Sequence, residues 1–348
     1  MINVLIIDDS PLIRGLLTEI LQQANDINVV GCAEDPYQAR EMIKKLNPDV
    51  LTLDVEMPKM DGISFLKNLM RLRPMPVVMI STLTQKGSPI TLEALELGAV
   101  DFIAKPTSNV RAQLSHYASL VQQKVRIAAG ARIRSFKKAP PDTKPISSET
   151  EFLLNKVIAI GASTGGTEAI KEVLIKMPVN CPPIVITQHI PPVFSASFAE
   201  RMDRTCLINV KEAQHGDKLS PGWAYIAPGG LHLSVKKRGI ALYCQLDDGE
   251  PINRHKPAVD VLFDSLVDCG SKNVVATILT GMGADGAKGL LALKQNGAYT
   301  LAQDEYSSVV WGMPKAAIEN GCVDTILPLN EISSSVISLV MGEWKKNN

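Results

Sequence analysis

The chain has 348 residues, which is enough for two ordinary domains, each with its own core. Its 36 lysine and arginine residues balance 36 aspartate and glutamate residues, so no overall field favours nucleic acid or an anionic membrane as a partner. The six cysteines lack zinc-ligand spacing, the N-terminus lacks a basic signal region, and no apolar stretch approaches the roughly 18 residues of a membrane helix, so we expect a cytoplasmic protein without membrane insertion.

The first part of the chain alternates short apolar runs with amphipathic helical patterns. Strands that alternate with helices are typical of an α/β domain with a parallel sheet. We therefore predict a flavodoxin-like domain over residues 1–122, with a five-stranded parallel sheet. The expected strands are residues 4–7, 29–33, 50–53, 77–80 and 100–104.

Three aspartates follow two of these strands. Asp8 and Asp9 come after the first strand, and Asp54 ends the third. In a flavodoxin-like strand order these strands are neighbours, so the three carboxylates converge at the carboxyl edge of the sheet. Such crowding of like charge is unfavourable unless a cation neutralises it, and a hard, oxygen-binding ion such as Mg²⁺ fits.

Two further polar residues end the fourth and fifth strands at the same edge. Ser81 supplies a hydroxyl group and Lys105 an ammonium group. A carboxylate that faces a metal and a lysine can form an aspartyl phosphate, so Asp54 is the candidate phosphoryl acceptor. The simpler interpretation, in which Ser10 and Pro11 only start a helix, explains those two residues but not the polar groups at successive strand ends.

Four segments resemble the receiver domain of bacterial response regulators, over about residues 1–122. They are IDDSPLIR, LDVEMPKMDG, the Ser-Thr pair at 81–82, and DFIAKP. The resemblance implies that a chemotaxis histidine kinase phosphorylates Asp54. It also implies roles for other residues: Mg²⁺ held by Asp8, Asp9, Asp54 and the Glu56 carbonyl, Ser81 as switch hydroxyl, Phe102 at the switch aromatic position, and Lys105 on the phosphate.

The composition of residues 123–152 predicts a linker, because they contain a proline pair, a further proline, serine and threonine but no sustained strand pattern. Lysine and arginine outnumber aspartate and glutamate in this segment and could contact an acidic partner, although a solvated spacer is the more common outcome for such a composition.

A second α/β pattern occupies residues 153–345 and predicts a doubly wound α/β domain. Its expected strands are residues 157–160, 184–187, 274–280 and 298–302. Between the second and third of these, residues 223–227, 231–235 and 240–245 are separated by Gly-Gly and Arg-Gly turns, which predicts a small antiparallel insertion.

Ser163 lies in the segment GASTGG, directly after the first strand of this domain and before a helix. The segment fits G-x-S-x-G, in which a sharp turn exposes a serine nucleophile and nearby backbone N–H groups can stabilise an oxyanion. A phosphate-binding loop is the structural competitor, but the nucleotide-binding pattern G-x-x-x-x-G-K-[ST] is missing.

His189 is the candidate base, because it alone among the five histidines directly ends a buried-strand run, and Pro191 and Pro192 then turn the chain off the sheet. His255, just before a helical pattern, is the strongest rival and could contact substrate. His232 lies inside the expected insertion and is typical of a framework residue.

Asp285 is the candidate carboxylate, in the loop Gly281–Gly286 that joins a strand to a helix. A carboxylate there could orient His189 through its Nδ1 proton. The same loop satisfies G-x-G-x-x-G, with Asp304 at the distance of a ribose-binding acid, so a dinucleotide site is a real alternative. Against it, Asp285 would repel a pyrophosphate. The order Ser, His, Asp also differs from that of α/β-hydrolases.

Residues 153–345 resemble the catalytic domain of chemotaxis protein-glutamate methylesterases in the segments IGASTGGTEAI, TQHIPP, YIAPGG, HKPAVDVLF, LTGMGADGAKG and GMPKAA. The resemblance implies a phosphorylation-regulated hydrolase that demethylates glutamates and deamidates glutamines on methyl-accepting chemoreceptors. It implies Ser163, His189 and Asp285 as the triad, the Met282 N–H as an oxyanion donor, and no cofactor in the catalytic domain.

The pairing of the two domains and the family resemblance imply that the unphosphorylated receiver covers the Ser163 edge and that phosphorylation weakens this contact. Two other classes stay open at this point. One is a nucleotide-binding oxidoreductase and the other a receiver joined to a catalytically silent interaction module. A DNA-binding output is disfavoured, because the second half shows no helix-turn-helix pattern and the charge is balanced.

Overall fold

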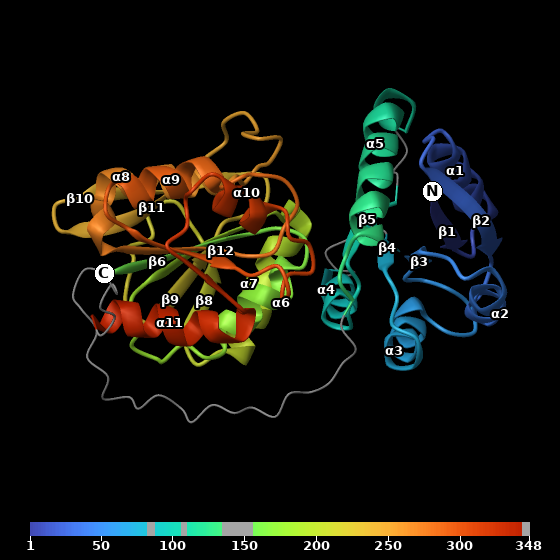
Figure 1. The fold of residues 1–348 in the computed structure, drawn as a ribbon, viewed down its shortest axis with the longest axis horizontal. Coiled ribbons are helices and arrows are strands. Elements are labelled where there is room, and N and C mark those ends of the chain that lie inside the picture. The colour runs from blue at the N-terminus through green and yellow to red at the C-terminus, as the bar shows by residue number, and fades with distance from the viewer. Residues whose placement is uncertain (82–87, 106–109, 134–155, 343–348) are drawn as a thin grey trace. The chain divides into compact units, whose positions relative to one another are not determined.

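The structure, a computed structural model, describes residues 1–81, 88–105, 110–133 and 156–342 (Figure 1). The chain divides into two compact units, Met1–Lys138 and Ala139–Asn348, and each is described by itself. Among the described helices, none combines the length and apolarity that a transmembrane span needs.

The first unit is a five-stranded parallel sheet with strand order β2-β1-β3-β4-β5, which confirms the flavodoxin-like prediction. Helix α1 packs on α5, and α3 packs on α4. The strands are β1 (Ile2–Ile7), β2 (Ile27–Ala33), β3 (Val50–Asp54), β4 (Val77–Ser81) and β5 (Asp101–Ala104). The helices are α1 (Pro11–Gln22), α2 (Pro36–Leu46), α3 (Gly62–Leu72), α4 (Ser88–Glu96) and α5 (Val110–Ala129).

Side-chain caps begin the first three helices of this unit. Ser10 accepts a hydrogen bond from Ile13 N and precedes Pro11, as the simpler interpretation of this segment expects. Asp35 and Asp61 cap α2 and α3 in the same way. A short oxygen-bearing side chain satisfies backbone N–H groups that have no partner within the helix, so Ser10, Asp35 and Asp61 mark where these helices begin.

The predicted boundary at residue 122 falls inside α5, which continues to Ala129. The linker predicted for residues 123–152 therefore begins within this helix. Helical side-chain spacing persists through Val121 and Val125, both fully buried, which explains why the helix continues. Most of the predicted linker lies outside the described residues.

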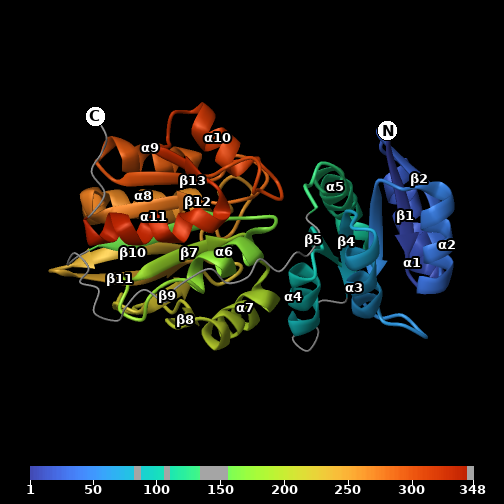
Figure 2. The ribbon, with the colours of Figure 1, turned by 60° about the horizontal axis from the view of Figure 1, so that its bottom comes forward.

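The second unit is built on a seven-stranded sheet with order β14-β13-β12-β6-β7-β9-β8. Helices α8, α9 and α10 cover one face, and α6, α7 and α11 cover the other (Figures 1 and 2). The strands of this sheet are β6 (Val157–Ala162), β7 (Ile184–Gln188), β8 (Asn209–Glu212), β9 (Trp223–Ile226), β12 (Val274–Ile278), β13 (Tyr299–Gln303) and β14 (Thr325–Leu327). The helices are α6 (Gly166–Leu174), α7 (Pro192–Thr205), α8 (Val259–Gly270), α9 (Ala287–Gln295), α10 (Met313–Glu319) and α11 (Leu329–Met341), with a 3₁₀ turn at Ser271–Asn273.

The antiparallel insertion is smaller than predicted. Only β10 (His232–Arg238) and β11 (Ala241–Asp247) form an antiparallel pair. The segment Trp223–Ile226 is instead β9, which lies parallel to β7 and β8 in the main sheet, so its assignment to the insertion is wrong. Three of its four residues are buried, as in a strand covered on both faces, whereas a hairpin strand alternates.

Candidate active site and phosphoryl-acceptor site

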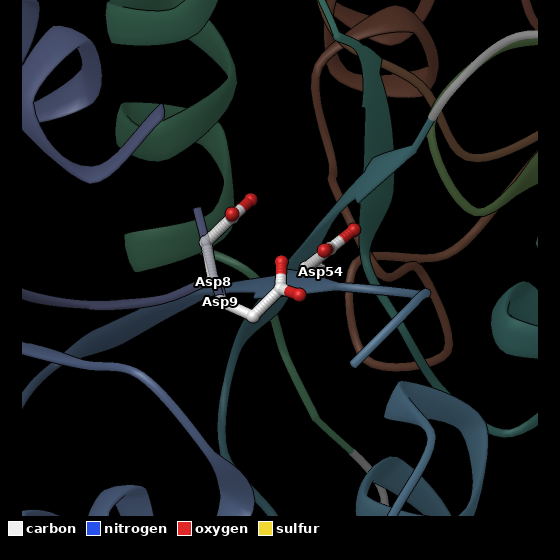
Figure 3. Close-up of side chains that lie close together, drawn as sticks. All are labelled: Asp8, Asp9 and Asp54. Atoms are coloured by element: carbon white, nitrogen blue, oxygen red, sulfur yellow. The ribbon is translucent and has the colours of Figure 1, made fainter. Parts of the chain in front are cut away.

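The first candidate site is the acidic cluster at the carboxyl edge of the first sheet. Ile7 pairs with Leu53 across β1 and β3, so the residues that follow them, Asp8 and Asp54, come together. Ligand oxygens of Asp8, Asp9 and Asp54 all lie within 4.8 Å of one another (Figure 3). Carboxylate oxygens at this spacing are suited to a hard divalent cation.

Lys105 is the cation that this cluster itself provides. Its Nζ lies 2.8 Å from Asp54 Oδ2 and 3.0 Å from Asp8 Oδ2. Burial raises the pKa of Asp54 to about 6, with Asp8 adding to the rise and Lys105 opposing it. Burial alone would lower the pKa of Lys105, but its contacts with the two carboxylates raise it. One ammonium does not balance three carboxylates, so the residues present fit a divalent cation such as Mg²⁺.

Of the other predicted receiver residues, Ser81 and Glu56 lie at the same edge, whereas Phe102 lies inside a strand. Ser81 ends β4 and is buried, and its backbone carbonyl accepts a hydrogen bond from Lys105 N at 2.7 Å. Glu56 follows β3 and is exposed. Phe102 lies within β5, where Lys124 Nζ sits 5.3 Å from the centre of its ring.

Gly62 explains how the loop after β3 closes on the cluster. A Cβ atom at this position would collide with the backbone oxygen of Asp54. Only glycine therefore allows α3 to start so close to the acceptor candidate.

The second candidate site begins at Ser163, in the turn between β6 and α6. Ser163 N donates to Thr280 O at 3.0 Å, and Ser163 O accepts from Gly166 N at 2.7 Å. Gly165 has φ +76, a left-handed conformation in which a Cβ would also meet Val309. This is the sharp strand-to-helix turn that G-x-S-x-G predicts.

His189 follows the neighbouring strand in register with Ser163. Ala162 pairs with Gln188 across β6 and β7, and His189 N donates to Ala162 O at 3.1 Å. The side-chain amide of Gln188 also donates to Ser163 O at 2.9 Å. The ends of these two strands are thus joined by direct hydrogen bonds.

Asp285 reaches His189 from the other side of β6. The two side chains meet through His189 Nε2 and Asp285 Oδ2, 2.8 Å apart. The predicted contact through Nδ1 is therefore wrong. Strand β6 lies between β7 and β12, and the side chains must span this middle strand, so the ring atom farther from the backbone makes the contact. Nδ1 of His189 is buried and has no hydrogen-bond partner among the described residues.

The carboxylate of Asp285 accepts hydrogen bonds from side chain and backbone. Its Oδ2 also accepts from Val259 N at 2.6 Å, at the first residue of α8, and its Oδ1 accepts from Asn253 Nδ2 at 2.8 Å. Burial by itself would raise the pKa of Asp285, but the bonds from His189, Asn253 and Val259 outweigh it and lower the pKa to about 2. Asp285 is therefore held as an anion.

Met282 lies in the loop between β12 and α9, next to Gly281. A Cβ at Gly281 would lie 2.7 Å from Ser163 Cβ, so this loop packs directly against the serine. Gly281 N already donates to Val310 O at 3.0 Å, whereas the Met282 N–H has no hydrogen-bond partner among the described residues.

Two residues at this site were not predicted as part of a network. Asn253 contacts Asp285, and the ring of His255 stacks on His189 with centroids 3.7 Å apart and planes 9° from parallel. The sequence predicts His255 as a rival base, but no sequence pattern indicates that its ring stacks on His189. Asn253 precedes an arginine in a polar segment, and this pattern indicates only a turn.

Two other candidates have local roles. His232 accepts from Ala258 N at 3.2 Å through Nδ1 and contacts Glu250 O at 3.0 Å through Nε2, as expected of a framework residue. Asp304, the candidate ribose-binding acid, accepts from Ser307 N at 2.8 Å within its own loop.

Comparison with known proteins covers both units. The family model described as CheB methylesterase matches residues 158–336, and the response regulator receiver domain matches residues 4–115. A protein-glutamate methylesterase/protein-glutamine glutaminase of Nitrosomonas europaea is 54% identical, over 99% of this chain and 98% of its own length. Its counterpart in Salmonella typhimurium is 51% identical, over 97% of each chain.

Among solved structures, the methylesterase catalytic domain of Thermotoga maritima CheB is 42% identical, with a TM-score of 0.52, and covers 53% of this chain and 98% of that domain. These matches show that the chain belongs to the protein-glutamate methylesterase/protein-glutamine glutaminase family, the hydrolases of chemotaxis that carry a response regulator receiver domain.

Proposed function

We propose that Ser163, His189 and Asp285 form the catalytic triad of this hydrolase. The observation that carries the proposal is the 2.8 Å contact between His189 Nε2 and Asp285 Oδ2, beside a serine on a strand-to-helix turn. A serine, a base and an orienting carboxylate are the groups that acyl transfer requires.

In the acylation step, Ser163 Oγ attacks the side-chain carbonyl carbon of a methylated glutamate, and His189 takes the serine proton on Nδ1. This nitrogen is the one left without a partner among the described residues, while Nε2–H donates to Asp285. The ring then returns the proton to the methoxide oxygen and methanol leaves. Asp285 stays ionised and stabilises the imidazolium.

The developing oxyanion lies near the loop between β12 and α9. We assign the Met282 N–H as a donor to it, because the neighbouring Gly281 N–H is already bonded to Val310. Thr164 N–H is a second candidate by its position alone.

In the deacylation step, His189 removes a proton from water, which attacks the acyl group. The ring then returns that proton to Ser163 Oγ, and glutamate and free Ser163 are released. A glutamine side chain enters the same cycle with ammonia as the leaving group. No cofactor takes part in either reaction as we propose it.

Replacing Ser163 with alanine tests the nucleophile. We expect methanol release from a methylated chemoreceptor fragment to fall by about five to six orders of magnitude. Residual turnover within a hundredfold of the unmodified enzyme would mean that Ser163 is not the nucleophile.

We further infer that Asp54 accepts a phosphoryl group from a chemotaxis histidine kinase. Asp8, Asp9, Asp54 and the Glu56 carbonyl would hold Mg²⁺, which when bound offsets phosphoryl charge. Lys105 would pair with the phosphoryl oxygens, and Ser81 and Phe102 would respond to the new group as switch residues. The support is the clustering of the carboxylates around Lys105.

Phosphorylation then controls the hydrolase, and methyl-accepting chemoreceptors are its substrates. We place the receiver in the first unit, through the end of α5 at Ala129, and the catalytic domain at residues 153–345, with inhibition by the unphosphorylated receiver as the mode of control. If a fragment starting near residue 150 were no faster than the full unphosphorylated chain, this mode of control would be wrong.

A cytoplasmic site of action suits six cysteines that are all free thiols.

A further inference from the structure

A two-residue turn lies beside the proposed triad, between β11 and α8. Ile252 N donates to His255 O at 3.1 Å, and His255 N donates to Ile252 O at 2.9 Å. The two residues between them, Asn253 and Arg254, have φ 54 and φ 69. Turns of this kind require left-handed backbone at both central positions, which asparagine tolerates and arginine rarely adopts.

Packing in the core does not explain the unfavourable backbone conformation of this turn. Asn253 and Arg254 are exposed, and Ile252 is 44% exposed. Strained backbone that persists without a packing reason is a marker of a functional requirement.

The contacts of the Asn253 side chain supply that reason. Its single amide nitrogen donates to Asp285 Oδ1 at 2.8 Å and to Asp260 Oδ2 at 2.7 Å. Each of the two amide hydrogens can thus serve one buried carboxylate. Asp285 is 2% exposed and Asp260 is 5% exposed.

Two buried carboxylates this close repel each other unless a donor lies between them. Burial raises the pKa of Asp260, and the charge of Asp285 adds to the rise, while the bonds from Gly289 N and Asn253 oppose it. Asp260 is also held by Gly289 N at 2.8 Å, so it forms a fixed anchor. Asp285 is joined to that anchor in two ways: the Asp260 N–H donates to Asp285 Oδ1 at 3.3 Å, and the side-chain amide of Asn253 bonds to both carboxylates.

His255, the last residue of the turn, contacts His189, which pairs with Asp285. The ring of His255 stacks on His189 with centroids 3.7 Å apart. The same turn therefore contacts Asp285 through Asn253 and His189 through His255.

We propose that Asn253 is a positioning residue, whose amide holds Asp285 against Asp260 in the orientation that pairs with His189. The Ile252–His255 turn carries the amide to this place. The inference rests on the proposed roles of Ser163, His189 and Asp285.

The test measures kcat and KM for methanol release from a methylated chemoreceptor fragment, using full-length variants. Asn253→Gly keeps the left-handed backbone and removes the amide. Asn253→Asp keeps the shape and the turn but replaces the donor by an acceptor. The matched control is Asn47→Gly, which makes the same change at an asparagine with φ 45 in the receiver.

We expect kcat to fall about ten- to a hundredfold in Asn253→Gly and further in Asn253→Asp, with KM within twofold and the control at the unmodified rate. A purely structural role would lower the folded fraction and not kcat per folded molecule. If Asn253→Gly does not fold, Asn253→Asp decides in the same way.

A folded variant at position 253 with kcat within twofold of the unmodified enzyme would overturn the inference. Ser163→Ala, measured in parallel, separates this failure from that of the triad. An inactive Ser163→Ala beside a fully active Asn253→Gly refutes only the role of Asn253, whereas an active Ser163→Ala refutes the proposed function itself.

Discussion

His189 Nε2 lies 2.8 Å from Asp285 Oδ2, although 96 positions separate the two residues in the chain. The contact crosses the end of β6, which carries Ser163 between the two strands that precede His189 and Asp285. A parallel sheet thus gathers, at one edge, groups that the sequence holds far apart.

Asp285→Asn should lower kcat by about three to four orders of magnitude while the fold persists. The asparagine amide can donate a hydrogen bond to Nε2, whereas the carboxylate can only accept one from it. The variant therefore no longer holds His189 with Nε2 protonated and Nδ1 free to act as base. Methanol release checks this, with Asp268→Asn as control, because Asp268 is an exposed carboxylate near the end of α8 in the same unit. A loss below tenfold would contradict the orienting role.

The low pKa of Asp285 predicts how stability depends on pH. Its value of about 2 in the folded chain lies below the ordinary 3.8, because the hydrogen bonds to the carboxylate outweigh its burial. A lowered pKa stabilises the folded state above pH ~4, by about 2 kcal/mol, and this contribution disappears as the pH falls towards 2.

Urea unfolding at several pH values between 6 and 2 would measure this effect. Tryptophan fluorescence reports on the second unit alone, because Trp223, Trp311 and Trp344 all lie within it. The free-energy difference between the unmodified chain and Asp285→Asn should shrink as the pH falls below 4. A difference that is independent of pH would show that Asp285 is not held as a stabilised anion.

Gly281→Ala should reduce kcat at least tenfold, since its Cβ would lie 2.7 Å from Ser163 Cβ and would displace the serine or the loop. We also expect a loss of roughly 1–3 kcal/mol in the free energy of unfolding. Gly15→Ala is the control, because a Cβ there meets nothing within 4 Å. Normal turnover by Gly281→Ala would mean that this loop does not fix the serine.

Asp54→Asn should abolish the increase in methanol release that a small phosphodonor and Mg²⁺ produce, and should incorporate no acid-labile phosphate. The amide cannot form the acyl phosphate. Asp49→Asn, at an exposed aspartate of the same unit, should respond normally. Stimulation that survives in Asp54→Asn would place the acceptor elsewhere.

Much of the fold could be predicted from the sequence, because its signals are local. Buried strands read as apolar runs, and Ser10 and Pro11 mark a helix start that the structure confirms. The parallel strand β9 was misassigned, since a short apolar run between glycine turns looks the same in a hairpin and in a central sheet. Only its long-range partners distinguish the two.

The candidate sites were predictable only as far as strand ends could locate them. Position after a strand placed Asp8 beside Asp54 and His189 next to Ser163 in register, but it could not tell which ring nitrogen meets Asp285. The contact of Asn253 with Asp285 joins a turn to a loop 32 positions away in the chain. No periodicity in the sequence predicts such a contact.

Together, the two proposed sites make this chain a serine hydrolase whose rate depends on phosphorylation of Asp54. The most direct test is methanol release by the full chain from methylated chemoreceptor fragments, with and without a small phosphodonor and Mg²⁺, beside Ser163→Ala. We predict release that rises on phosphorylation and vanishes in Ser163→Ala. Release that is unchanged by confirmed phosphorylation of Asp54, or that persists in Ser163→Ala, would contradict the account.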